Sequence, residues 1–552
     1  MSFGRGPAGR TPHARGPGAN ISALGPFADF VADVEADRVH LIHLSPRDPD
    51  TGTILDLYRT DWPWDGPPAA PTRLGSSIQI ATSIFQQGFI ANPISVPRVG
   101  VIDIGGDDSP SLGADDAEDV SPTDFDAWTA YQWKERAVEI LLGSPDFSFS
   151  QFQPVLVGVV ADVQWGRDRF SLVVVDRFHE LSTKLIQTER YGGGGGRDGG
   201  TDLDGKTRPL LFGDGYNVPL QLVDAANDVY EVHSRETEGP LSGTNEGVHD
   251  AGVLLTAAGS VADVYAWTPV SGSWVYETGA SGTYVRLGAP PNGLVTADWK
   301  GDKDPTLGYS NAPGHIYRVI AQWKGGLADA DLDLQSFTEF ATATTAPIGL
   351  FVPSGSVSTV PQALAQILPS TVLGFAEFTR TGQLRIARLE FDTSVATFTP
   401  DPRNIDRAPT ETPYWRRSLG WRRAWVRQDE DTLGSIPAAL REFVTKDYRE
   451  SVAEDATVQT GFPSAQDLTI PTLYRDESDA STEAARQLAL VKLQRDRYRV
   501  KVYGQQFLRR LGETVTLQTP LYGLSAGRDC LILGIEEDTS DRSTVLELWG
   551  GP

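Results

Sequence analysis

Short apolar runs separated by turn residues dominate this chain and most strongly constrain its fold. VHLIHLS (39–45) and SIQIATSIF (77–85) alternate between apolar and polar residues, the period of a strand with one buried face. PVLVGVVADVQWGRDRFSLVVVDRF (154–178) is two apolar runs around a polar tip, the pattern of a hairpin. The 56 glycines and 37 prolines disfavour long helices. We therefore predict a mainly β fold with α+β insertions.

A chain of 552 residues is too long for one ordinary core, so we predict several domains. The two largest are expected to be barrel-like, with smaller β and α+β units between them. In chain order the predicted segments are a Gly/Pro/Arg arm (1–27), a first β-barrel domain (28–190), a glycine-rich linker (191–207), a small β domain (208–300), an α+β domain (301–400), and a C-terminal domain with helices and a second β-barrel (401–552).

Helical spacing is confined to a few segments. Ile316, Val319, Ile320 and Trp323 predict one helix face, and STVPQALAQILPST (358–371) predicts a shorter helix opened near Thr359. SIPAALREFVTKDY (435–448) and STEAARQLALVKLQRDR (481–497) predict two more near the C-terminus. Short strands are predicted within 208–300 at DVYEVH (228–233), VADVYAWTPV (261–270), GSWVYET (272–278) and TYVRLG (283–288).

The net charge of −25 narrows the possible partners. An acidic surface repels phosphate backbones and anionic membranes, so general nucleic-acid binding is disfavoured, and a pore lined by it would let DNA slide. The segment 107–126 is acidic and rich in turn residues, which predicts a solvated loop. No run approaches the length of a membrane span, so we expect no membrane insertion by this chain.

A literal phosphate-loop pattern, G-T-D-L-D-G-K-T, lies at 200–207. Such a loop needs a strand before it and a helix after it. Here a run of glycines precedes it, Pro209 follows closely, and Asp202 and Asp204 would place carboxylates in the cradle. We interpret the match as part of the linker and expect no nucleotide cofactor.

Candidate metal and nucleophile sites are weak. His40 and His43 are three apart, which on a strand directs them to opposite faces. Asp329, Asp331 and Asp333 begin like a calcium loop, but Leu334 and Phe340 occupy the positions that need glycine and glutamate. The lone Cys530 lies in an apolar strand and favours an inert, buried thiol. We expect no metal, no cofactor and no catalytic residue, and hence no enzyme.

The segment 414–427, YWRRSLGWRRAWVR, interleaves aromatic and basic residues. This composition suits single-stranded nucleic acid, but it also suits a protein interface or pairing within the chain, which the acidic overall charge favours. The candidate interface residues are Trp415, Arg416, Arg417, Trp421, Arg422, Arg423, Trp425 and Arg427.

Four stretches carry a resemblance to a known family. They are YGGGGG with GKTRPLLFGDGYNVPLQLVDAANDVYEVH (191–233), PPNGLVTADWKGDK (290–303), VPQALAQILPSTVLGFAEFTRTGQLRIARLE (360–390) and the C-terminal stretch from RYRVKVYG to STVLELWG (497–550). Together they resemble the baseplate hub or tail-tip proteins of long-tailed, siphovirus-type bacteriophages and related tail-like particles. The resemblance covers 190–400 and 480–550 best and rests on packing and turn motifs.

The resemblance implies a structural virion protein, assembled in the host cytoplasm. It implies a homotrimer whose two barrel domains per chain form a pseudo-sixfold ring. That ring would join the tail tube or distal tail protein to a central fibre or spike and other baseplate proteins. Phage DNA and the tape measure protein would pass through its channel. The alternative is a glycan-binding or glycan-cleaving receptor-recognition protein, with Trp62 and Trp64 of DWPWDGPP as sugar platforms.

Overall fold

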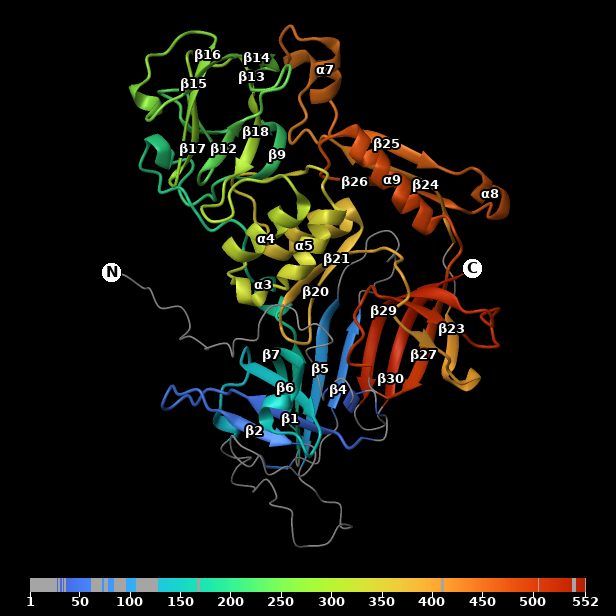
Figure 1. Ribbon diagram of the computed structural model, residues 1–552. Helices are drawn as coiled ribbons and strands as arrows, with labels where there is room; N and C mark the ends of the chain where they lie inside the picture. Colours follow the sequence, from blue (N-terminus) through green and yellow to red (C-terminus); the bar gives the residue numbers. More distant parts are fainter. Residues whose placement is uncertain are drawn as a thin grey trace.

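The computed structural model describes most of the chain as an elongated stack of units. The described residues are 27, 30–31, 33, 36–60, 72–73, 78–83, 96–105, 128–165, 169–408, 412–504, 506–538 and 543–551. The N-terminal strands and the last strands of the chain lie together at one end, helices occupy the middle, and a second β unit lies at the other end (Figure 1). The 107–126 loop, Trp62, Trp64 and residues 1–26 lie outside the described residues.

One 14-stranded sheet joins the two ends of the chain. Its main path is β23 (Ile405–Ala408), β27 (Asp496–Tyr503), β30 (Ser543–Gly550), β29 (Arg528–Asp538), β4 (Ile78–Ser83), β5 (Val96–Gly105), β8 (Arg169–Val175), β7 (Gln153–Trp165), β6 (Ala137–Gly143), β1 (Val39–Leu44), β2 (Leu57–Thr60) and β3 (Thr72–Arg73). Off this path, β28 (Thr514–Leu517) pairs with β29 and with β22 (Thr397–Phe398). The predicted strands at 39–45 and 77–85 and the hairpin at 154–178 are confirmed.

The N-terminal and C-terminal halves of this sheet meet at the pairing of β4 with β29. The pairing is antiparallel and runs from Ser83 opposite Gly534 to Gln79 opposite Asp538. In the described part of the chain the sheet is an open path and neither half closes into a barrel. The prediction of two barrel-like domains is therefore not confirmed. Strands from the two ends of the chain pair edge to edge, which local spacing cannot reveal.

A β unit of two packed sheets forms the far end of the stack. One sheet has the order β10 (Gln221–Asp224), β11 (Val229–His233), β17 (Gly282–Leu287), β16 (Ser273–Gly279) and β15 (Thr256–Ser260). The other contains β14 (Val253–Leu254), β13 (Val248–Asp250), β18 (Val295–Asp302), β9 (Leu210–Pro219) and β19 (Gly349–Val352), with β12 (Thr237–Pro240) also paired to β18. Between them lies an apolar core centred on the buried Trp274 and Trp299. The strand predicted at 261–270 is wrong, because Asp263 accepts the Tyr265 N–H and begins a short 3-10 turn, Val264–Ala266.

The middle unit packs helices on a hairpin. Helices α3 (Phe178–Ser182), α4 (Pro313–Trp323), α5 (Leu334–Ala343) and α6 (Val360–Ile367) share a core with β20 (Gly374–Phe378) and β21 (Leu384–Arg388). Ile316, Val319 and Ile320 are buried, as the spacing predicts. A π-helical segment, Leu368–Val372, continues beyond α6 and contains Pro369.

Local sequence determines where α6 begins, and this can be tested. Thr359 accepts the N–H of Gln362, and the Gln362 side chain accepts the N–H of Thr359, a capping box. We expect Thr359→Ala to lower the free energy of unfolding by about 1 kcal/mol, measured by denaturant titration. Thr338→Ala, on the exposed side of α5, is the matched control and should change it little.

The glycine-rich segment 191–206 is an ordered loop. Tyr191 and Leu203 are buried, and the Gly192 N–H donates to the Asp198 carboxylate at 2.9 Å. Arg197 pairs with Glu277 at 2.5 Å and with Asp263 at 2.7 Å. The linker expected from composition is thus anchored to the β unit, because positive φ angles at several glycines allow tight turns that carry these polar contacts.

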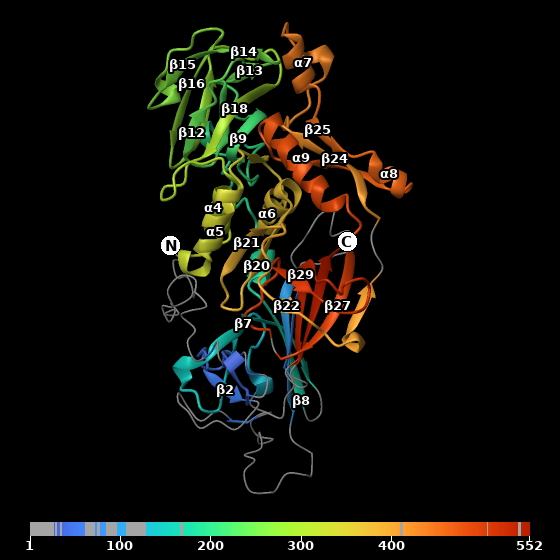
Figure 2. The ribbon, with the colours of Figure 1, turned by 45° about the vertical axis from the view of Figure 1, so that its right-hand side comes forward.

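The last part of the chain divides between the two ends of the stack. Residues 414–491 form a small sheet of β25 (Arg449–Glu454), β24 (Tyr414–Trp421) and β26 (Gln466–Pro471), with α9 (Glu477–Val491) packed on it and with α7 (Ala438–Val444) and α8 (Thr457–Gly461) nearby. This helix–sheet unit lies beside the β unit, whereas residues 496–550 return to the large sheet (Figures 1 and 2). The predicted helices at 435–448 and 481–497 are confirmed, although α7 is shorter than expected.

Candidate interaction surfaces

The Trp–Arg segment 414–427 makes extensive contacts within the chain. Arg417 is fully buried and its Nε donates to Gln487 of α9 at 2.8 Å. Burial lowers the pKa of Arg417 to about 10. Arg416 is half-buried and lies opposite Glu454 and Asp467 on the neighbouring strands. The first half of the segment therefore holds α9 and the small sheet together.

The second half of the segment packs against the β unit. The Arg422 guanidinium lies over the rings of Tyr216 and Phe443, at 4.4 and 5.2 Å from their centroids. Trp425 contacts Phe351 with its centroid 5.9 Å away, and Arg423 lies 4.2 Å from the Trp425 ring.

The remaining candidates are more accessible. Trp415 and Trp421 are half-buried, the latter against the core of the middle unit, and Arg427 is exposed. These contacts correspond to the alternative of pairing within the chain. A role of the same residues toward another subunit stays a prediction.

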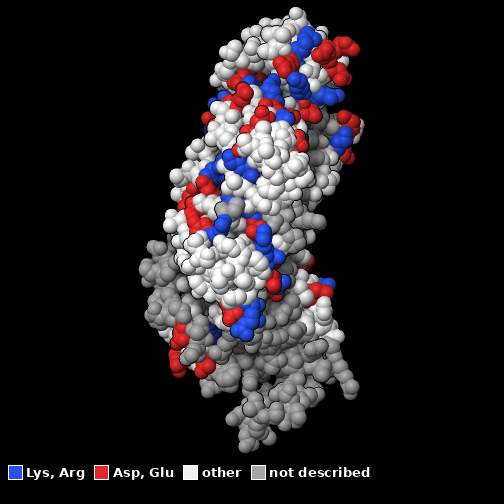
Figure 3. All heavy atoms as spheres, turned by 90° about the vertical axis from the view of Figure 1, so that its right-hand side faces the viewer, with Lys and Arg blue, Asp and Glu red and all other residues white. Residues whose placement is uncertain are grey.

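The surface charges do not form a single-sign patch on the face in Figure 3. Lys and Arg lie among Asp and Glu over the described part of that face. The three carboxylates of the calcium-like pattern are each used internally: Asp329 pairs with Arg318 at 2.6 Å, Asp331 with Arg177 at 2.5 Å, and Asp333 caps α5. Within the described residues no group of carboxylate, histidine or cysteine side chains could hold a metal ion.

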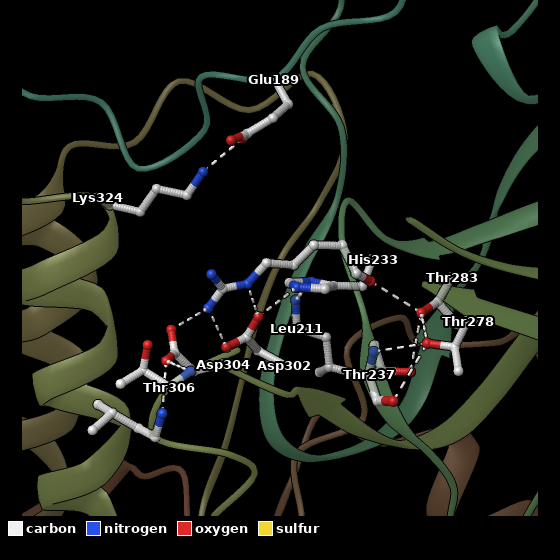
Figure 4. Close-up of polar contacts among 12 residues, drawn as sticks. Glu189, Leu211, His233, Thr237, Thr278, Thr283, Asp302, Asp304, Thr306 and Lys324 are labelled. Carbon is white, nitrogen blue, oxygen red and sulfur yellow. Dashed lines mark hydrogen bonds and ion pairs between the residues drawn. The ribbon is translucent and has the colours of Figure 1, made fainter. Parts of the chain in front are cut away.

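A buried polar network lies in the β unit beside the end of α4, and Figure 4 shows its side chains together with the separate Lys324–Glu189 pair. His233 Nε2 lies 3.0 Å from Asp302, while His233 Nδ1 accepts the Leu211 N–H at 2.9 Å. Nδ1 therefore carries no proton, and Nε2 donates to the carboxylate. Burial lowers the pKa of His233, which keeps the ring neutral.

Arg235 extends this network, and Lys324 forms a separate ion pair beside it. Arg235 binds Asp302 through Nε and Nη2, the latter at 2.6 Å, and also reaches Asp304 at 3.1 Å. Burial opposes ionisation of Asp302, but the hydrogen bonds from Arg235 and His233 outweigh it and lower the Asp302 pKa. Lys324 at the end of α4 pairs with Glu189 at 2.6 Å.

The network does not offer a catalytic group. Both ring nitrogens of His233 are engaged, so the ring cannot accept a proton from a substrate without losing a contact. Cys530 is buried and burial raises its pKa to about 12, as the inert-thiol interpretation expects. His40 is buried, whereas the His43 ring stacks on Tyr58. The two side chains therefore have different surroundings, as expected for opposite faces of the strand.

The phosphate-loop pattern has no phosphate-loop geometry. Residues 200–207 form turns followed by an isolated bridge rather than a helix start, and the Thr207 hydroxyl donates within the chain to Gln187 and Ser356. An open hollow of about 400 Å³ lies beside Lys206 and Thr207. This geometry is consistent with our interpretation that the pattern is not a nucleotide-binding loop.

No protein-family model matches the chain, and no curated protein matches it. Several solved structures are similar. A tail protein from Neisseria meningitidis MC58 is 11% identical with a TM-score of 0.35, and the match covers 92% of this chain and 96% of that protein.

Two further structures have related descriptions. The 43 kDa tail protein of prophage MuSo2 from Shewanella oneidensis is 10% identical with a TM-score of 0.38, over 92% of this chain and 95% of that one. A chain of the native gene transfer agent virion is 11% identical with a TM-score of 0.40. That match covers 63% of this chain and 85% of the virion chain. By their descriptions, these three structures are tail and virion proteins. The described helices include none long and apolar enough to cross a membrane.

Proposed function

We propose that this chain is a structural hub protein of a phage or phage-like tail tip, located in the virion and assembled in the host cytoplasm. Copies would form a ring that joins the tail tube or distal tail protein to the central fibre or spike. The ring would line the channel for DNA and the tape measure protein. We propose no enzymatic activity for it.

The observation that carries this proposal is the pairing of β4 with β29. It places the N-terminal and C-terminal strand groups side by side in one open sheet, so each chain presents two β halves. Among the described strands, β23 and β3 end this sheet and each has one partner. A contact between unlike ends of successive copies is heterologous, and such contacts form a ring where the rotation between copies closes.

Three copies would supply six β halves to such a ring. This arrangement fits a sixfold tail tube, and each half would complete its barrel-like curvature against a neighbour. The net charge of −25 also suits a wall along which DNA must slide without binding.

The ring can be tested by measuring the mass of the assembly and the rate of amide hydrogen exchange at the edge strands of the large sheet. We expect native mass spectrometry to find three copies of the chain. Amide exchange at β23 (405–408) should slow on assembly, because its outward N–H groups gain strand partners. β15 (256–260), the edge of a different sheet, is the control and should keep its exchange rate. A monomer at all concentrations, even with a tail-tube partner, would contradict the proposal.

A further inference from the structure

The only Asn-Gly dipeptide of the sequence, Asn292–Gly293, lies on the surface of the β unit. It belongs to the loop of residues 288–294 that connects β17 to β18 (Figure 1), and both residues are exposed to solvent. An asparagine side chain is most easily converted to a carboxylate when glycine follows it, because glycine has no Cβ to hinder the reaction. Within this sequence, the dipeptide is therefore the position most open to deamidation.

The conversion of the amide to a carboxylate needs water as its only co-reactant. The Gly293 nitrogen loses its proton to solvent base, and its electron pair attacks Cγ of Asn292 to form an N–Cγ bond. The Cγ–Nδ2 bond then breaks, and the amide nitrogen takes up a proton from water and leaves as ammonia. Water opens the resulting succinimide ring at one of its two carbonyl carbons. Attack at Cγ gives aspartate, and attack at the main-chain carbon gives isoaspartate.

One buried carboxylate binds both nitrogens that take part in this reaction. Asp250 of β13 is 7% exposed. Its Oδ1 accepts the Gly293 N–H at 2.9 Å, and its Oδ2 accepts the Asn292 side-chain amide at 2.8 Å. The Asn292 main-chain N–H also donates to Asp250, at 2.9 Å from each oxygen. Because a carboxylate can only accept, the side-chain atom of Asn292 that faces it is Nδ2.

The contacts with Asp250 oppose deamidation in two ways. The negative charge of Asp250 lies against the Gly293 nitrogen, so it disfavours the anionic nitrogen that has to form before the attack. Any rotation of the Asn292 side chain has to break the hydrogen bond from Nδ2 to a charged acceptor, which is stronger than a bond between neutral groups. Both effects slow the reaction for as long as the loop stays on Asp250.

We propose that Asn292–Gly293 is a latent deamidation site and that Asp250 keeps it unmodified in the folded chain. Deamidation to aspartate would place a second carboxylate where Nδ2 now lies 2.8 Å from Oδ2 of Asp250. Isoaspartate would add a carbon to the main chain directly before β18. Since β18 pairs with β9, β12 and β13, either product would disturb a strand with three partners.

Peptide mapping by mass spectrometry measures the conversion on the full chain during incubation at mildly alkaline pH. In Asp250→Ala, conversion at Asn292 should be about tenfold to a hundredfold faster than in the unmodified chain, the factor that corresponds to the loss of one hydrogen bond to a charged group. Asp250→Asn keeps an acceptor oxygen but no charge, so its rate should lie between the two. Circular dichroism establishes that each variant is folded.

A second aspartate in the β unit provides a matched control. Asp224 of β10 accepts Nδ2 of Asn227 at 2.8 Å and the Asn227 main-chain N–H at 3.3 Å. Asp224→Ala therefore removes hydrogen bonds of the same kind, but Asp228 and not glycine follows Asn227. Conversion at Asn227 should stay slow in this variant. A rate equal to that of Asn292 in Asp250→Ala would show that the glycine does not select the site and would overturn the assignment.

The rates in the folded variants decide the role of Asp250. Conversion at Asn292 that is no faster in Asp250→Ala and Asp250→Asn than in the unmodified chain would overturn the proposal. If neither variant folds, the unmodified chain is compared with the same chain unfolded in urea at the same pH. Conversion at Asn292 should then be at least about tenfold slower in the folded chain, and equal rates would refute the protection.

Discussion

Replacement of Trp299 by alanine should destabilise the β unit by about 3–5 kcal/mol, the usual cost of emptying a fully buried aromatic site. Trp299 is 0% exposed and packs against Trp274 and Tyr276, with ring centroids 5.9 and 5.2 Å away. Its indole N–H also donates to the Thr237 hydroxyl at 2.8 Å. The measurement is the free energy of unfolding from denaturant titration.

Two comparisons make this result specific. Trp299→Phe keeps most of the ring volume but loses the hydrogen bond, so it should cost much less than alanine. Tyr503→Ala removes an aromatic ring that is 66% exposed and should change stability little. Equal losses for Trp299→Ala and Tyr503→Ala would show that the two-sheet core does not depend on Trp299.

Asp302→Ala should also cost about 3–5 kcal/mol, because it leaves the buried His233 and Arg235 without their shared acceptor. Asp302 is 5% exposed, and its partners are His233 at the end of β11 and Arg235 just after it. Arg235 lies 3.5 Å from the ring centroid of Trp323 in α4, so the loss of Asp302 also weakens this contact with α4. Thermal or denaturant unfolding at neutral pH measures the effect.

The pH dependence distinguishes this mechanism from simple loss of packing. The pKa of Asp302 is lower in the folded chain than in the unfolded chain, so its contribution is present above the ordinary aspartate pKa. That contribution is lost as pH falls through the lowered pKa of Asp302. The difference in free energy of unfolding between Asp302→Ala and the unmodified chain should therefore become smaller in acid. Asp401→Ala, which removes an exposed pair with Arg403, is the control and should have little effect at any pH.

Much of the local structure was predictable because it depends on neighbours in sequence. Alternation predicted β1 and the β7–β8 hairpin, and helical spacing predicted α6 with its start near Thr359. The strand predicted at 261–270 failed for an equally local reason, since the Asp263 side chain caps a turn there. Composition predicted a linker at 191–207 but did not show that Arg197 has carboxylate partners at Glu277 and Asp263, which anchor this segment.

The candidate site was less predictable than the elements. The composition of 414–427 suggested either an interface or pairing within the chain, but it did not indicate which residues the segment contacts. The His233 and Asp302 pair carried no sequence signal, since the two residues lie on different strands and share no motif spacing.

The sequence by itself determined the strand-rich character, the helix faces and the acidic charge, because periodicity, capping and composition act over a few residues. The tertiary structure alone decided that the two ends of the chain share one sheet and that Trp and Arg side chains connect the units. It also decided which hydrogen-bond partners surround each buried histidine. These features depend on contacts between residues tens to hundreds of positions apart, and such contacts are set by the packing of whole units rather than by any local pattern.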